Sequence, residues 1–230
     1  MLDSRKYLNA FQLKLIAACA MLIDHTVYVF YSEQLFLRSI GRLAFPIFAY
    51  MVAIGYSRTR NLKNYIFRML LFAILAQVPY VFMIGDFKNI PFNVIFTLLF
   101  GLISIYAIDK GGLIIGFIVS LALALFAQFG GFDHYAFGVL LVIAFYYTRD
   151  SKLLRNISST ILILLFTLSY LIPYGVESWI WIIILFYLFA IPFINLYNNK
   201  KGIDNPFTKW FFYVFYPIHI SLIVLLSKIL

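Results

Sequence analysis

The chain alternates between long apolar runs and short polar connections over almost its whole length. A helix needs about 20 mostly apolar residues to cross a bilayer, and shorter spans occur. Gly, Pro, Asn and Asp fill the connections, which is typical of turns. The pattern predicts about nine membrane-spanning helices, within a range of about eight to ten because the sixth is short. The predicted spans are residues 13–31, 36–56, 64–84, 93–108, 113–128, 135–148, 156–173, 178–196 and 209–229.

The composition places these helices in lipid. Of the 230 residues, 64% are hydrophobic and 12% are charged, and the mean hydropathy is +0.96. Soluble domains average about 45–50% apolar and about 25% charged residues, so one globular core could not bury this much apolar surface. Because lipid cannot hydrogen-bond an open backbone, the spans should be helical. We therefore predict an all-α fold, a polytopic integral membrane helical bundle made of one domain, residues 1–230.

The net charge of +9 follows the membrane topology. Lys and Arg concentrate in the cytoplasmic connections of membrane proteins. Here the N-terminus, with Arg5 and Lys6, and every second connection carry most of the basic residues. This asymmetry predicts a cytoplasmic N-terminus and a lipid bilayer, rather than nucleic acid, as the partner. No small-residue cleavage site follows the first apolar run, so we expect that run to be a retained span and not a signal peptide.

Asp24 and His25 interrupt the second half of the first apolar run. An ionisable residue there costs roughly 2.5–3.5 kcal/mol on insertion scales, so such residues are functional candidates. At about 1.5 Å of helix per residue, His25 and Arg42 both lie about 9 Å below the outer surface. Arg42 can therefore pair with Asp24, and a histidine beside them can move a proton near neutral pH. Later spans place further polar residues in the same half or near the middle: Gln77, Asn93, Thr97 and His219.

Each of these features also has a purely structural interpretation. Polar residues join helices in membrane bundles, and a single histidine on an apolar helix can be a core residue. The basic segment "YSRTRNLKNYIFR" can be a topology signal or an anchor for a phosphate-bearing cytoplasmic ligand. Its cations are Arg58, Arg60, Lys63 and Arg68. The sequence has no Gly-rich phosphate loop, serine nucleophile elbow or His–Glu metal motif, so we expect no metal and no serine or zinc hydrolysis.

Several segments, in order along nearly the whole chain, resemble the TraX family of membrane proteins. They are "LKLIAACAMLIDH", "LRSIGRLAFPIFAYMVAIGYSRTR", "FNVIFTLLFG", "DHYAFGVLL" and "FYVFYPIHISLIVLL". The founding member of that family acetylates the N-terminus of a conjugative pilin subunit. The resemblance therefore implies a multi-pass protein of the bacterial cytoplasmic membrane that uses cytoplasmic acetyl-CoA as its donor substrate.

The resemblance also assigns residues. The matching positions are Asp24, His25, Gly41, Arg42, Pro46, Asn93, Phe96, Thr97, Asp133, Tyr216, Pro217 and His219. The chain departs from the family pattern at Gln77, where a Glu is expected, at Ile54, which also replaces a frequent Glu, and at His134. These departures bear on the acceptor more than on the chemistry.

We therefore expect acetyl transfer to an amine or hydroxyl of a pilin-like, peptide or glycan acceptor. His25 is the expected base, Arg42 pairs with Asp24 or polarises the thioester carbonyl, and His219 is the rival base. Substrate and acetyl-CoA are expected to contact Asn93, Thr97, Gln77, Tyr216, Arg58, Arg60, Lys63 and Arg68. Two alternatives use the same buried groups: a proton-coupled transporter and a non-catalytic assembly factor.

Overall fold

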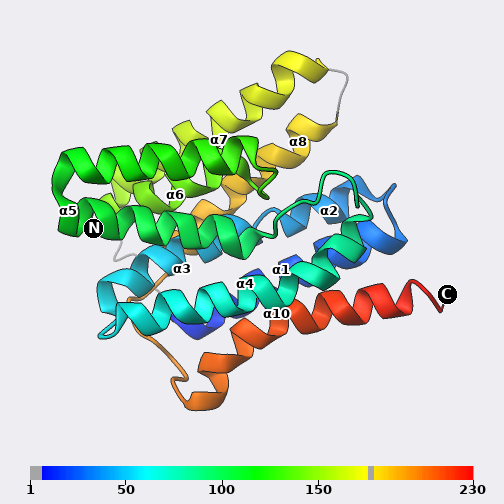
Figure 1. Ribbon diagram of the computed structural model, residues 1–230, viewed down its shortest axis with the longest axis horizontal. Helices are drawn as coiled ribbons and strands as arrows, with labels where there is room; N and C mark the ends of the chain where they lie inside the picture. Colours follow the sequence, from blue (N-terminus) through cyan, green and yellow to red (C-terminus); the bar gives the residue numbers. More distant parts are fainter. Residues whose placement is uncertain (1–6, 176–178, 230) are drawn as a thin grey trace. The chain divides into compact units, whose positions relative to one another are not determined.

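The computed structural model describes residues 7–175 and 179–229 of the chain. Within these ranges every named element is helical (Figure 1). Arg5 and Lys6, which entered the topology prediction, lie outside the described residues. The elements are α1 (Ala10–Phe30), α2 (Leu35–Gly41), α3 (Ala44–Arg58), α4 (Leu62–Ile84), α5 (Val94–Phe129), α6 (Tyr135–Tyr147), α7 (Lys152–Tyr174), α8 (Ile180–Leu185), the 3-10 helix η1 (Phe186–Phe189), α9 (Ala190–Asn195) and α10 (Pro206–Leu226).

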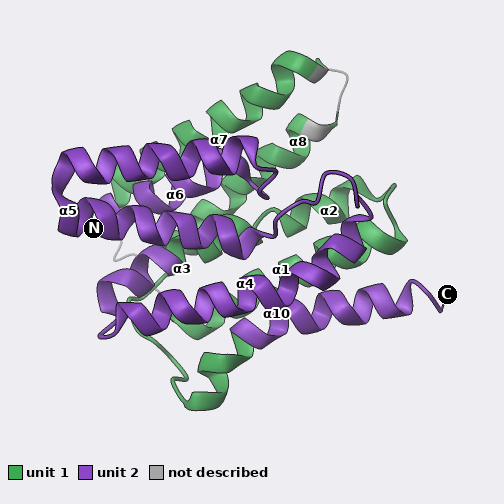
Figure 2. Cartoon of the chain, in the orientation of Figure 1, with its two compact units in different colours: residues 1–51, 151–212 green, residues 52–150, 213–230 purple. Residues whose placement is uncertain are grey.

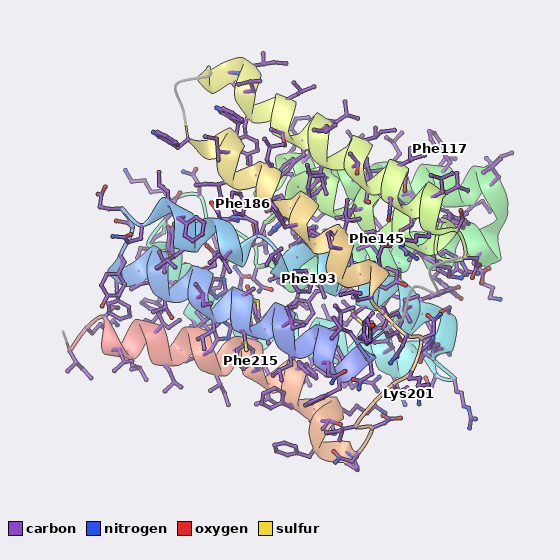
Figure 3. All side chains as sticks on the ribbon, turned by 180° about the vertical axis from the view of Figure 1, so that it is seen from behind. Phe117, Phe145, Phe186, Phe193, Lys201 and Phe215 are labelled. Atoms are coloured by element: carbon purple, nitrogen blue, oxygen red, sulfur yellow. The ribbon has the colours of Figure 1, made fainter. Side chains whose placement is uncertain are left out.

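The helices agree with a polytopic bundle of about nine spans. Six stretches of the described chain are long and apolar enough to cross a membrane, and two shorter apolar stretches accompany them, Tyr135–Tyr147 and Trp181–Asn195. One of the six is α5, which holds two of the predicted spans. Apolar side chains cover the outside of the helices as lipid contact requires, and Phe117 of α5 is 63% exposed (Figure 3).

The helix α5 is a hairpin rather than one long rod. Gly112 lies inside it with φ 77° and ψ 178°, a conformation that ends the first arm and starts the second. Gly tolerates this positive φ because it has no Cβ. The far ends of the two arms meet, since Phe92 N donates to Gly131 O at 3.0 Å and Asp133 N donates to Phe92 O at 2.9 Å. The arms lie side by side (Figure 1), which confirms the two separate spans predicted at 93–108 and 113–128.

The second predicted span, residues 36–56, is not one helix. It breaks after Gly41 into α2 and α3, with a turn at Arg42 and Leu43. Pro46 lies in the first turn of α3, where its missing N–H costs no intrahelical hydrogen bond, so the break lies where proline is best tolerated. The expectation of a continuous second helix was therefore wrong, although the apolar stretch Leu35–Arg58 keeps the length of a span.

The chain divides into two compact units (Figure 2). Unit 1 contains residues 1–51 and 151–212, and unit 2 contains residues 52–150 and 213–230. In unit 1, α2 packs on α1 and α8, and α7 packs on α8 and α9. In unit 2, α5 packs on both α4 and α6. The single domain expected from the sequence stays a prediction.

Basic connections gather at one end of unit 1. Leu8 N donates to Leu196 O at 3.0 Å and Ala10 N to Lys200 O at 2.9 Å, which holds the start of α1 against the loop that precedes α10. Lys201 lies in the same loop (Figure 3). At the start of α7, Arg155 donates to Asn195 Oδ1 at 2.6 Å, so this helix begins at the same end.

Basic connections gather at one end of unit 2 as well. Tyr56, near the end of α3, donates to Asp109 Oδ2 at 2.8 Å, close to the bend in α5. Its ring also lies 5.1 Å from the ring of Tyr146 at the end of α6. Arg58, Lys110 and Arg149 therefore share one end of the unit. This grouping is what the positive-inside rule requires; the side of the membrane that each end faces stays a prediction.

Candidate functional site

The charged cluster of unit 1 is formed by Asp24 on α1 and two arginines that follow on α2 and at its end. Asp24 Oδ2 lies 3.6 Å from an Nη of Arg42, and Asp24 Oδ1 lies 3.8 Å from Nε of Arg38. The three side chains are 15–23% exposed. The structure thus confirms that Arg42 lies beside Asp24. It also adds Arg38, which the sequence analysis did not name as a site residue.

The spacing of the two arginines was a usable signal. Arg38 and Arg42 are four residues apart, and residues four apart on a helix share a face. A carboxylate that meets one of them can therefore meet both. The guanidinium of Arg38 also lies over the ring of Tyr28, 5.0 Å from its centroid, which is a favourable cation–π geometry.

Gly41 lets α2 approach α1 at this cluster. A Cβ added at Gly41 would overlap the Cβ of Asp24. Packing density inside proteins leaves no room for such an overlap, so one of the two helices would have to shift. Gly41 therefore sets the distance across which Asp24 reaches the arginines.

His25 is half-buried on α1 next to Asp24. Adjacent residues on a helix point about 100° apart, so the two side chains leave α1 in different directions. Asp24 faces Arg38 and Arg42. The arrangement therefore gives the carboxylate a role at the arginines, and orientation of His25 by Asp24 stays a prediction.

Unit 2 holds a second, uncharged cluster centred on Asn93. This residue is fully buried and caps α5, because its Oδ1 accepts from Ile95 N at 3.1 Å. Its Nδ2 donates to Ala73 O and to Gln77 Oε1, both at 2.8 Å. Gln77 Nε2 in turn donates to Pro91 O at 2.7 Å. These bonds tie α4 to the start of α5 and satisfy polar groups that lipid could not.

Thr97, one turn along α5 from Asn93, reaches the loop between α5 and α6. Its hydroxyl donates to Asp133 O at 2.5 Å. Asp133 Oδ1 lies 2.9 Å from Nδ1 of His134, and His134 and Tyr135 have positive φ values of 64° and 48°. Positive φ is uncommon outside glycine and is held here by the surrounding structure. The sequence analysis named Thr97, Asp133 and His134, but it did not predict that the last two side chains pair.

The helix α10 supplies Tyr216 and His219, which are both buried. Tyr216 lies by the backbone of Val94 at the start of α5, and its ring meets that of His219 at 5.6 Å, edge to face. His219 Nδ1 lies 2.7 Å from Phe215 O, and its ring stacks on that of Phe215 (Figure 3 labels Phe215). A carbonyl can only accept, so in the neutral ring this contact favours the tautomer with the proton on Nδ1 and the lone pair on Nε2.

Two ring contacts show how α10 runs along α4. The rings of Phe72 and Tyr213 are 5.4 Å apart, and Nζ of Lys228 lies 5.0 Å from the ring of Phe82. The earlier residue of α4 meets the earlier residue of α10, and the later one meets the later one. The two helices therefore run in the same direction within unit 2.

This register brings Gln77 and His219 to one level. Gln77 follows Phe72 by five residues and His219 follows Tyr213 by six, so each lies roughly 8–9 Å beyond that contact. Gln77 and His219 therefore lie at a similar level within unit 2, and Asn93 lies beside Gln77 through its hydrogen bond. That this level falls in the outer half of the membrane stays a prediction. A common level with Asp24, His25 and Arg42 in unit 1 stays a prediction.

The four basic residues expected at acetyl-CoA separate into two kinds. Arg58, Arg60 and Lys63 are exposed at the connection between α3 and α4. Arg68 is half-buried further along α4, and its guanidinium lies 5.9 Å from the ring centroid of Tyr65 and 5.8 Å from that of Tyr213.

Two more cations at this end of unit 2 were not singled out from the sequence. Lys110 Nζ lies 3.2 Å from Asp109 Oδ2, and Arg149 lies over the ring of Tyr146 at 4.2 Å. As for metals, no group of three or more His, Cys, Asp or Glu side chains in the described ranges could hold an ion.

Comparison with known proteins gives two matches. The family model described as "TraX protein" matches residues 10–227. The "Probable fimbrial assembly protein FimC, serogroup H1" of Dichelobacter nodosus is 30% identical over 242 residues, which cover 94% of this chain and 94% of that protein. No solved structure matches the chain.

Proposed function

The chain belongs to the TraX family, and from that membership we propose that it is a membrane-embedded acetyltransferase. It takes an acetyl group from cytoplasmic acetyl-CoA and transfers it to an amine or hydroxyl of an acceptor in the membrane or on its outer side. The similarity to a probable fimbrial assembly protein supports a pilin-like acceptor, with other peptides and glycans as alternatives. The membership itself confirms the resemblance found in the sequence.

The observation that carries this proposal is the polar layer of unit 2. It combines a buried histidine of defined tautomer, His219, with the amides of Gln77 and Asn93 at one level of apolar helices. An acetyl transfer needs a base for the acceptor proton and donors for the oxyanion that develops on the thioester carbonyl. The imidazole supplies the base. Both N–H groups of the Asn93 amide are bonded to Ala73 O and Gln77 Oε1, so the oxyanion donor in this layer is the amide N–H of Gln77 that does not bond Pro91 O.

The proton acceptor is one of two histidines. In the transfer, the acceptor nitrogen or oxygen forms a bond to the acetyl carbon while a histidine nitrogen takes its proton. The carbon–sulfur bond then breaks, and the proton passes to the sulfur that leaves. His25 is half-buried beside the charged cluster of unit 1, and His219 presents the lone pair of Nε2. In this proposal Arg42 pairs with Asp24 or polarises the thioester carbonyl.

The donor binds at the basic end of unit 2. Arg58, Arg60 and Lys63 are exposed there and attract the phosphates of CoA. Arg68, held between two tyrosine rings, lies further into the unit and meets the part of the donor that enters the helices. Replacing Arg58, Arg60 and Lys63 by Gln should weaken CoA binding, most strongly at low salt where the attraction is least screened. Lys200→Gln, also at an exposed cation, is the matched control.

A second candidate function is favoured by the printed name of the relative, which describes assembly and no catalysis. In that case the polar layers hold helices together and the protein helps a pilus to assemble without chemistry. Only the transferase function yields an acetylated acceptor.

The experiment uses the purified protein in nanodiscs with isotope-labelled acetyl-CoA and a synthetic peptide that carries a pilin N-terminus. Mass spectrometry follows the label on the peptide, and a thiol reagent follows the release of CoA. Labelled peptide together with CoA release supports the transferase. Binding of the peptide without label on any peptide or glycan acceptor, and without CoA release, contradicts it and favours the assembly factor.

A further inference from the structure

Arg38 takes no part in the proposed acetyl transfer. Its Nε is buried and forms no hydrogen bond within the described residues, since the 3.8 Å to Asp24 Oδ1 exceeds hydrogen-bonding distance. The same carboxylate also faces Arg42 at 3.6 Å. One carboxylate thus serves two guanidinium groups, and neither contact gives Arg38 the short, paired geometry that arginine forms with an oxyanion.

Other groups near Arg38 do not replace that geometry. Glu33, in the connection between α1 and α2, is exposed and pairs with neither arginine in the described part of the chain. Tyr28 offers the face of its ring, 5.0 Å from the guanidinium carbon. A ring face orients the planar guanidinium and leaves its N–H groups, which lie in the plane, directed outward.

The position of Arg38 matches the level of lipid headgroups. It lies three residues after the start of α2, roughly 5 Å along the helix axis. Two aromatic residues near it in the sequence are exposed, with Phe36 at 68% and Tyr31 at 60%. Aromatic residues at this level are typical of the membrane interface, and arginines near helix ends extend toward it.

From these observations we propose that Arg38 binds the phosphate of an anionic phospholipid at the corner between α1 and α2. A guanidinium matches two phosphate oxygens with two parallel N–H groups. The negative lipid supplies the charge that Asp24, shared with Arg42, does not supply in full. The bound lipid then joins α1 to α2 at the site where Gly41 allows them to touch.

The test titrates short-chain phosphatidylglycerol into the full-length protein in a neutral detergent and follows the thermal unfolding midpoint. The wild-type midpoint should rise and saturate. In Arg38→Gln the half-saturating lipid concentration should increase about tenfold or more, the loss expected when a paired charge-assisted contact is removed. Arg38→Lys keeps the charge without the paired geometry and should fall between the two. Lys152→Gln, at an exposed cation of the opposite end of unit 1, should match the wild type.

Asp24→Asn separates lipid binding from a structural ion pair. It removes the carboxylate that competes with the phosphate, so the proposal expects lipid to bind this variant as tightly as the wild type or more tightly. An Arg38 that serves only to hold Asp24 predicts an equal lipid response in the wild type and in Arg38→Gln, and that result overturns the proposal. Inorganic phosphate should not raise the midpoint. If phosphate alone does so, and Arg38→Gln abolishes the effect, the ligand is a soluble phosphate compound and the lipid assignment is wrong.

Discussion

The two polar clusters hold polar side chains among apolar helices by different interactions. In unit 1, Asp24 meets Arg38 and Arg42 through charge, over distances of 3.8 and 3.6 Å. In unit 2, Asn93 and Gln77 form hydrogen bonds of 2.7–2.8 Å to backbone oxygens and to each other. The first cluster holds net charges that remain costly if one partner is lost. The second holds neutral groups whose bonds are short and directional.

This difference indicates which cluster can rearrange when a ligand binds. Neutral amides that cap a helix and hold a loop carbonyl fix the backbone, so the Asn93 cluster is a rigid support for Thr97 and its neighbours. Long ion pairs around one carboxylate can rearrange when an anion or a developing charge arrives. We therefore expect unit 1 to respond to ligands and unit 2 to hold the level at which His219 lies.

The largest effect on stability should come from Asp24→Asn in a neutral detergent. The change leaves two guanidinium groups beside a neutral amide. The free energy of unfolding of the protein should fall by about 3 kcal/mol. This value is at the lower end of the range for a broken buried ion pair, because these side chains keep some exposure. Titration with a denaturing detergent measures this difference. A loss below about 0.5 kcal/mol would place the cluster with ordinary surface pairs and remove the contrast between the two units.

The second-largest loss of stability should come from Asn93→Ala. It removes the cap of α5 and the side-chain donor to Ala73 O, whereas Gln77 Oε1 keeps the backbone N–H of residue 93. We expect a loss of about 2–3 kcal/mol. Ser at this position restores the cap alone and should recover about 1 kcal/mol of it. The same detergent titration applies. If salt changes this loss as strongly as it changes the loss in Asp24→Asn, then the Asn93 cluster is not the neutral one.

Gly41→Ala tests the close approach in unit 1. The added Cβ overlaps Asp24 and forces α2 away from α1, which should lower the free energy of unfolding by about 1–2 kcal/mol. Gly85→Ala is unsuitable as a control because Gly85 has a φ of 76°. Ala18→Gly, on the buried face of α1, is a better one, since it changes helix propensity by about 1 kcal/mol without touching the contact. Only Gly41→Ala should also weaken the response of the protein to phosphatidylglycerol.

The smallest effect should come from an ion pair outside the spans. Lys201 Nζ donates to Asp204 Oδ2 at 2.7 Å, and this bond holds the pKa of Asp204 below its usual value. A lowered carboxyl pKa gives stability that is present above the unfolded pKa of about 3.9 and is lost as the pH falls below it. Because both side chains are more than half exposed, Asp204→Asn should reduce stability by less than about 0.5 kcal/mol at pH 7. The unfolding curves of the variant and the wild type should differ slightly at pH 7 and coincide at about pH 3.

Much of the fold was predictable because lipid imposes simple rules. Apolar length gives the spans, and the depth of each residue along a helix gave the pairing of Asp24 with Arg42. The break between α2 and α3 was missed because the apolar run continues through it, although Pro46 was a signal for a helix start. Gly112 was read correctly as the end of a span, since "DKGG" interrupts the apolar pattern.

The parts of the site that were missed depend on loops. Gln77 was expected at the right level, but its bond to Pro91 O depends on the course of the chain between α4 and α5. The contact of Thr97 with Asp133 O likewise depends on the turn in which His134 has a positive φ. Arg38 was not predicted as a site residue, although it lies four residues before Arg42 and therefore shares its face of the helix.

The most direct test of the central claim compares two histidine variants in the acetyl-transfer assay. His25→Ala and His219→Ala are purified in nanodiscs, shown to unfold at the wild-type midpoint or above, and given labelled acetyl-CoA and acceptor. We predict that one of them lowers turnover by about a hundredfold or more, the usual contribution of a general base, while the other changes it far less. Wild-type turnover in both variants would contradict the account, because the polar layers would then serve only to hold the helices together.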